Sequence, residues 1–152
     1  MRLKKLFREI KNEITNYERY ANQELKLIGY PGYERTDTIV AEKLSFSQWL
    51  ECYKKWPVIK VEGIESNDLV LKYFSRFKPK NIHLFYSQRT GSSFKWHWDD
   101  VNVFLFVVRG HKVVSLRSKR VLLKAGEGIV IPKHHLHKVF SKAGTWALSV
   151  GF

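Results

Sequence analysis

Residues 97–112 read HWDDVNVFLFVVRGHK and combine a histidine–carboxylate pair with a nearly continuous apolar run. His97 and Asp99 stand two positions apart, which on a β-strand places both side chains on the same face. The run from Val101 to Val108 is interrupted only by Asn102, so we expect both faces of its strand to be covered, one by a barrel interior and one by helices. The stretch therefore predicts a β-barrel with two polar groups directed into it.

Short β-rich runs, separated by glycine and polar turns, surround this stretch. They cover residues 82–87, 94–98, 101–108, 112–116, 121–123, 128–131, 137–140 and 146–152. Strands of this length and spacing, after a helical N-terminal third, predict a mainly β fold in which helices pack outside a sandwich or barrel.

The N-terminal third shows helical periodicity. Apolar residues at three- and four-residue steps predict one amphipathic helix over 3–28, which ends before the turn at 29–32. An extended run at 38–41, a helix to about residue 55, a strand at 58–61 and a helix over about 67–77 are expected to follow. We predict a single domain over 1–152, with a helix and turn at 1–37, an opening strand and helices at 38–80, and the barrel core at 81–152.

The composition limits the classes of function. With 152 residues and 44% hydrophobic content, the chain can fill one sizeable core. The single cysteine, Cys52, excludes an intramolecular disulfide and a cysteine-based zinc site. The longest apolar run is too short to cross a bilayer and the N-terminus is charged, so we expect a soluble, cytoplasmic protein that does not bind membranes.

Positive charge is concentrated in the last third of the chain. The formal net charge is +13, and within residues 109–152 the only acidic residue is Glu127. The basic residues there are Arg109, Lys112, Arg117, Lys119, Arg120, Lys124, Lys133, Lys138 and Lys142. This bias predicts either an acidic partner such as RNA or a ribonucleoprotein, or a basic face exposed to solvent, and no nucleic-acid motif decides between them.

A third nitrogen ligand would complete a metal site with His97 and Asp99. Two histidines and one carboxylate on one side of an ion leave coordination positions open and are typical of non-haem Fe(II). The histidines downstream are His111, His134, His135 and His137.

Two glycine-bounded segments resemble the two sequence motifs of cupins. Gly91, His97, Asp99 and Gly110 are spaced like the first motif, with aspartate in place of its second histidine. Gly126, Pro132 and His137 are spaced like the second motif. The resemblance implies a double-stranded β-helix, a jelly-roll barrel, with His97, Asp99 and His137 as metal ligands and catalytic centre. His134 and His135 are the alternatives to His137.

Residues 97–112 also resemble the JmjC hydroxylases, and among them the branch that hydroxylates ribosomal proteins. LSFSQWL at 44–50, Tyr53 and Pro57-Val-Ile59 are similar to the start of JmjC domains, so the resemblance covers roughly residues 38–152. It implies a dioxygenase that uses Fe(II), 2-oxoglutarate and O2 to hydroxylate a macromolecule, such as a ribosomal protein or RNA. Lys112 stands where these enzymes bind the distal carboxylate of 2-oxoglutarate. Phe94 replaces a frequent hydroxyl residue, and a second polar contact is expected from Tyr86, Ser93 or Ser149.

Two other classes of function are consistent with the sequence. One is a metal-binding cupin without 2-oxoglutarate chemistry, acting as a small-molecule enzyme or a sensor. The other is a basic nucleic-acid-binding protein on a cupin scaffold, and the sequence does not exclude a homodimer. Among the neighbours of the metal ligands, we expect Trp96 and Trp98 to be core residues rather than a substrate platform and Asp100 to face water.

Overall fold

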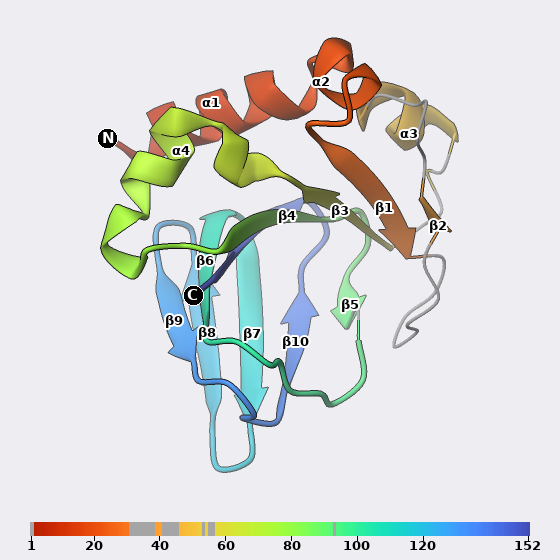
Figure 1. Ribbon diagram of the computed structural model, residues 1–152. Helices are drawn as coiled ribbons and strands as arrows, with labels where there is room; N and C mark the ends of the chain where they lie inside the picture. Colours follow the sequence, from red (N-terminus) through yellow and green to blue (C-terminus); the bar gives the residue numbers. More distant parts are fainter. Residues whose placement is uncertain (1, 31–38, 41–45, 53, 55–56, 93) are drawn as a thin grey trace.

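The computed structural model describes residues 2–30, 39–40, 46–52, 54, 57–92 and 94–152, and their strands form two antiparallel sheets (Figure 1). The larger sheet contains, in spatial order, β2 (Ile39–Val40), β1 (Lys26–Tyr30), β3 (Val58–Glu62), β4 (Asn81–Ser87), β11 (Thr145–Gly151), β6 (Val103–Arg109) and β9 (Gly128–Ile131). The smaller sheet contains β5 (Gly91–Ser92), β10 (His137–Ser141), β7 (His111–Leu116) and β8 (Arg120–Lys124). The two sheets pack around a shared interior, as expected for a jelly-roll barrel.

Helices cover the outer side of the larger sheet (Figure 1). They are α1 (Leu3–Ile14), α2 (Tyr17–Ala21), α3 (Phe46–Cys52) and α4 (Asp68–Tyr73), with 3-10 turns at Ile64–Ser66 and Ser75–Phe77. The buried face of α1, Leu6, Ile10 and Ile14, belongs to the same apolar cluster as Leu84 and Leu148 of the sheet. The predicted fold class, mainly β with helices packed outside a barrel, is therefore confirmed. Within the described residues, no helix combines the length and apolar character that crossing a bilayer requires.

Strand β6 is buried on both faces, as its apolar sequence predicts. Phe104, Phe106 and Val108 pack into the cluster beneath the helices. Val103, Leu105 and Val107 alternate with them and pack into the barrel interior. Because β6 lies between β11 and β9, neither face nor edge meets solvent along most of its length.

The prediction of one helix over 3–28 is wrong in its second half. Helix α1 ends at Ile14, α2 covers only Tyr17–Ala21, and residues 26–30 form β1. Asn16 caps α2 by accepting a hydrogen bond from the backbone N–H of Glu18, and Gln23 has a left-handed φ of 60°. Antiparallel pairing of β1 with β3 satisfies the backbone hydrogen-bonding groups of residues 26–30. Its apolar residues also fit a helical spacing, so the pattern alone could not separate the two states.

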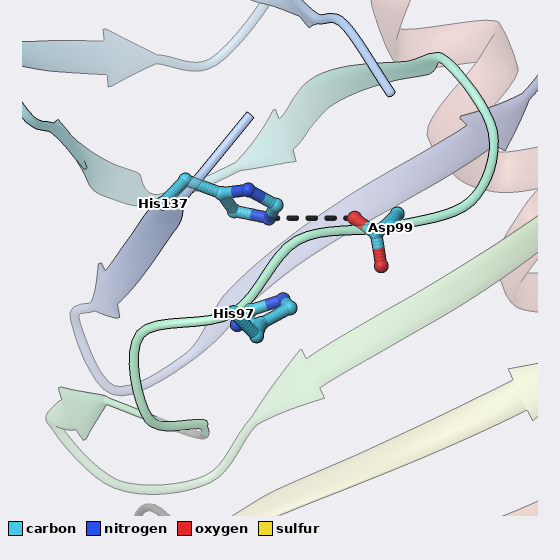
Figure 2. Close-up of side chains that lie close together, drawn as sticks. All are labelled: His97, Asp99 and His137. Carbon is cyan, nitrogen blue, oxygen red and sulfur yellow. Dashed lines mark ion pairs between the residues drawn. The ribbon is translucent and has the colours of Figure 1, made fainter. Parts of the chain in front are cut away.

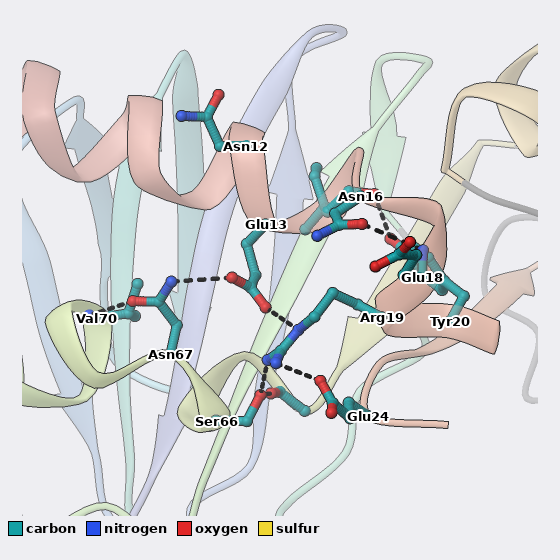
Figure 3. Close-up of polar contacts among 12 residues, drawn as sticks. Asn12, Glu13, Asn16, Glu18, Arg19, Tyr20, Glu24, Ser66, Asn67 and Val70 are labelled. Atoms are coloured by element: carbon teal, nitrogen blue, oxygen red, sulfur yellow. Dashed lines mark hydrogen bonds and ion pairs between the residues drawn. The ribbon is translucent and has the colours of Figure 1, made fainter. Parts of the chain in front are cut away.

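Polar side chains tie the N-terminal helices to the turn before α4 (Figure 3). Arg19 forms ion pairs with Glu13 and Glu24 and donates a hydrogen bond to Ser66. Asn67, which caps α4, also donates from Nδ2 to Glu13 Oε2 at 3.0 Å. This network joins α1 and α2 to the start of α4.

Seven of the eight β-rich runs predicted over 82–152 are strands, whereas residues 94–98 are not a regular strand. There the pairing reduces to a single bridge, in which the backbone N–H of His97 donates to His137 at 3.0 Å and that of His137 donates to His97 at 2.8 Å. Strand β6 correspondingly begins at Val103 rather than Val101. The extended run at 38–41 is described only at 39–40, and α3 and α4 lie within the predicted helical ranges.

Gly110 forms the tight turn between β6 and β7 and is expected to tolerate no side chain. Its φ is +88°, and an added Cβ would lie 2.8 Å from Thr145 Cα. We expect Gly110→Ala to lower the free energy of unfolding by about 2 kcal/mol or more, because backbone strain and a steric clash add. Gly144→Ala is the matched control, since Gly144 has a φ of +81° but nothing within 4 Å of an added Cβ. Denaturant unfolding should show a clearly larger loss for Gly110→Ala, and equal losses would disprove the close approach.

Candidate metal centre

His97, Asp99 and His137 come together at one end of the barrel interior (Figure 2). One nitrogen or oxygen atom of each side chain lies within 4.8 Å of the others. His137 Nε2 is 3.4 Å from Asp99 Oδ2, and the centroids of the two imidazole rings are 4.3 Å apart. His137 is buried, whereas His97 and Asp99 are partly exposed. Two imidazole nitrogens and one carboxylate oxygen are a donor set that suits Fe(II) and related divalent ions.

Backbone contacts set the orientation of both imidazoles. Nδ1 of His97 lies 2.7 Å from the carbonyl oxygen of Lys95, and Nδ1 of His137 lies 2.8 Å from that of His135. A carbonyl oxygen can only accept, so in each neutral ring Nδ1 carries the proton and Nε2 keeps a free lone pair. Burial is the main factor that lowers the pKa of His137, which favours this neutral form. Both rings are thus prepared to bind a cation through Nε2.

His97 and Asp99 come together by a different backbone arrangement from the one that their spacing predicts. We expected His97 and Asp99 to share a face of a regular strand, but Asp99 lies in an irregular segment. The backbone bridge between His97 and His137 fixes one side of that segment. On the other side the backbone N–H of His134 donates to the carbonyl oxygen of Asp99 at 2.8 Å. These backbone contacts hold the Asp99 carboxylate near the two imidazoles although the segment has no regular strand pairing.

The other candidate histidines lie outside the centre. His111, His134 and His135 are exposed. His134 has a left-handed φ of 63° and directs Nε2 to within 3.4 Å of the exposed carboxylate of Asp100. Asp100 therefore faces water, as predicted.

The prediction that Trp96 and Trp98 are core residues is wrong. They are 45% and 53% exposed, and Trp98 packs its ring edge-to-face against His134. Because the segment that carries them is not a sheet strand with covered faces, no layer is available to bury them. Trp96 also lines the cavity described next.

A cavity of about 630 Å³ adjoins the three metal-ligand candidates. Val101, Val103, Leu105, Ile131 and Val139 form its apolar wall. Asn81, His83 and Phe85 of β4, with Ser149 of β11, form a more polar wall. Lys95 and Trp96 line the cavity and are exposed, so they mark its mouth. The volume is in the range of small-molecule sites.

Lys112 is buried in the cavity wall with only 4% of its surface exposed. Its Nζ lies 5.9 Å from the ring centroid of Phe85. Among the described residues, no carboxylate forms an ion pair with it. Burial lowers the pKa of Lys112 to about 8. An uncompensated buried cation of this kind is expected to attract an anionic ligand.

This burial makes Lys112 costly for the ligand-free protein. Because its pKa falls from 10.5 to about 8 on folding, the unfolded chain holds the proton more tightly, and stability should rise with pH between those values. We expect Lys112→Met to raise the free energy of unfolding at pH 7 by about 3 kcal/mol. The difference in the free energy of unfolding between Lys112→Met and wild type should be smaller when denaturant unfolding is measured at pH 9.5. Lys124→Met, at an exposed position of β8, should change little at either pH, and a constant difference between wild type and Lys112→Met would contradict the assignment.

The three candidates for a second co-substrate contact lie in different places. Ser149 lines the cavity. Ser93 lies outside the described residues. Tyr86 lies on the opposite face of β4, packed against Phe46 and Trp146 beneath the helices, so it is withdrawn as a candidate. The alternation of β4 explains this placement, since His83 and Phe85 face the cavity while Leu84 and Tyr86 face away.

Tyr30, Lys60 and His83 also line the cavity and were not predicted from the sequence. Lys60 Nζ lies 2.7 Å from Glu62 Oε1. Burial opposes the charge of Lys60, but the contacts with Glu62 and Tyr30 outweigh it and raise the pKa of the lysine. Burial and the neighbouring Lys60 lower the pKa of His83, whose buried Nδ1 has no hydrogen-bond partner among the described residues. The positive charge of Lys60 is thus balanced by Glu62, whereas that of Lys112 has no such partner among the described residues.

Comparison with known proteins identifies the class of fold. Residues 85–149 match the sequence profile of the Cupin domain family, and with the antiparallel sheets this defines a cupin-type double-stranded β-helix. A comparison with curated proteins gives no significant match.

Matches among solved structures include a larger oxygenase and two shorter proteins. YcfD, a ribosomal oxygenase from Escherichia coli in complex with cobalt and succinic acid, aligns with a TM-score of 0.65 and 14% identity. The alignment covers 90% of this chain and 43% of YcfD, so the chain spans less than half the length of that enzyme. A cupin-2 domain protein from Shewanella frigidimarina aligns with a TM-score of 0.41 and 27% identity, covering 46% of this chain and 67% of that protein. KdgF from a Halomonas species aligns with a TM-score of 0.42 and 19% identity, and the alignment covers 47% of this chain and 66% of KdgF.

Proposed function

We propose that the protein is an Fe(II)- and 2-oxoglutarate-dependent oxygenase that hydroxylates a macromolecular substrate. The observation that carries the proposal is the pairing, in one cavity, of a His97–Asp99–His137 donor set with a buried, uncompensated Lys112. The donor set suits iron, and the ammonium group suits the distal carboxylate of a dicarboxylic acid.

The chain's own residues have three tasks in this reaction. His97, Asp99 and His137 would hold the iron, with both Nε2 lone pairs freed by backbone acceptors at Nδ1. Lys112 would orient 2-oxoglutarate through its distal carboxylate, and Ser149, which lines the cavity, would add a polar contact. The apolar wall would exclude water from the reacting atoms. When bound, the iron would couple conversion of 2-oxoglutarate and O2 to succinate and CO2 with insertion of one oxygen atom into a substrate C–H bond.

Two further observations support this choice over a cupin without 2-oxoglutarate chemistry. An apolar small-molecule site has no need of a buried ammonium group, which reduces stability unless an anion binds it. The larger oxygenase that shares this fold was solved with cobalt and succinic acid, a metal and the dicarboxylate that such a reaction forms.

The deciding experiment is an anaerobic titration of the Fe(II)-loaded protein with 2-oxoglutarate. We expect a weak visible charge-transfer band to grow and saturate as the keto acid chelates the iron, and succinate to form when oxygen is admitted. Iron binding without the band and without succinate would instead favour a metal-binding cupin with different chemistry. Failure to bind iron would contradict the metal centre itself.

A further inference from the structure

The outward face of the smaller sheet carries an exposed apolar row. Phe140 of β10 pairs with Val113 of β7, which pairs with Leu122 of β8, so the three side chains lie side by side across three strands. Phe140 is 43% exposed and Leu122 is 53% exposed. Their sequence neighbours Val139 and Leu123 pack into the barrel interior, which confirms that this row points outward. Exposed apolar rows of this kind mark contact surfaces.

Basic residues lie on both sides of that row. On one side, Lys138 pairs with Ser115, which pairs with Arg120. On the other side, His111 pairs with Lys124, and the backbone N–H of Lys142 donates to the carbonyl oxygen of His111 at 3.2 Å. We call these side chains, together with the apolar row, the outer face. Within the whole segment 109–152 only Glu127 is acidic, and its carboxylate accepts a hydrogen bond from the backbone of Lys124.

We infer that the outer face binds single-stranded nucleic acid. A row of aromatic and aliphatic side chains gives nucleobases a surface for stacking, and flanking cations neutralise the phosphates. A second copy of the chain is a poor occupant, because two such basic faces would repel each other. A double helix shields its bases from stacking, so an apolar row favours an unpaired strand.

The outer face is continuous with the mouth of the metal cavity. Along the edge of β10, Ser92 pairs with Phe140, and His97 pairs with His137. His137 points into the centre, while Lys138, the next residue, belongs to the outer face. Exposed Trp96 lines the cavity at the same edge and offers a second stacking surface. A nucleic-acid strand bound on the outer face would therefore pass the mouth of the metal cavity. Delivery of that strand to the metal centre rests on the proposed function, whereas binding to the outer face does not.

The test is fluorescence anisotropy with a labelled oligoribonucleotide of about 16 nucleotides, which covers the larger known site sizes. We expect tighter binding of the single strand than of the matching duplex, and a steep loss of affinity with salt. Arg120→Gln/Lys124→Gln should weaken binding about tenfold and flatten the salt slope by roughly one or more. Lys4→Gln/Lys5→Gln removes the same charge from exposed positions of α1 and should leave the affinity nearly unchanged. Equal effects of the two double variants would overturn the proposal.

Phe140→Ala separates stacking from charge. It should weaken binding of the base-carrying strand about fivefold or more, yet leave an abasic strand of the same length unaffected. Vesicles containing anionic phospholipid should not compete with the oligonucleotide, and strong competition that depends on Phe140 would assign the face to a membrane instead. Binding should survive chelation of iron and the His137→Ala substitution. Loss of oligonucleotide binding in the metal-free protein would show that the outer face does not act independently of the metal centre. Oxygenase activity is tested separately, by the titration with 2-oxoglutarate.

Discussion

Replacing His137 with alanine is expected to lower the affinity for Fe(II) by more than about 100-fold and to abolish succinate formation. Loss of a contact that merely orients a ligand costs about 10- to 100-fold in metal affinity or activity, so loss of a ligand should cost more. The side chain is buried beside His97 and Asp99, and among the described residues no further histidine belongs to this cluster. Competition with a fluorescent chelator under anaerobic conditions measures the affinity directly.

His135→Ala is the matched control for this substitution. His135 is exposed, and its contact with the centre runs through the backbone carbonyl oxygen, which the substitution keeps. The backbone bridge between His97 and His137 also survives in His137→Ala, so both variants should unfold near the wild-type temperature. If His137→Ala binds iron as tightly as His135→Ala, the three side chains are not the ligand set.

The clustering of His97, Asp99 and His137 could be predicted from sequence because these residues stand at motif spacings that the backbone enforces. Gly91 and Gly110 bound the segment that places His97 and Asp99 before β6, and Gly126 and Pro132 precede His137. Similarly, β6 has apolar side chains on both faces, and only a strand between two layers accommodates that pattern. These features are local, so a single sequence contains them.

The rest of the site depends on contacts that local patterns do not encode. Tyr30 and Lys60 reach the cavity because β1 and β3 extend the larger sheet beside β4, and residues 26–30 fit a helical spacing as well as a strand. The face of β4 that meets the cavity was also ambiguous, because Phe85 and Tyr86 are both large and aromatic. Packing of Phe46 and Trp146 against Tyr86 decides it. Trp96 and Trp98 are likewise exposed because residues 94–98 form no regular strand, which their residue types do not reveal.

Lys112→Met is expected to weaken 2-oxoglutarate binding roughly 100- to 4,000-fold while leaving Fe(II) affinity unchanged. The estimate follows from the cost of leaving one member of a buried ion pair without its partner, about 3–5 kcal/mol. Wild type should discriminate strongly against 2-oxopentanoate, which keeps the chelating keto acid but lacks the distal carboxylate. Lys112→Met should bind both acids alike.

Misfolding cannot mimic this result, because the same substitution is expected to stabilise the ligand-free protein. Lys112 is buried in the cavity wall, and methionine fills similar space without a charge. Lys124→Met, which removes a lysine from the exposed surface of β8, should alter neither the stability nor the preference for 2-oxoglutarate. A Lys112→Met protein that is more stable and still prefers the dicarboxylate would show that another group binds the distal carboxylate. In that case the iron centre and the co-substrate would stand, and the role assigned to Lys112 would be wrong.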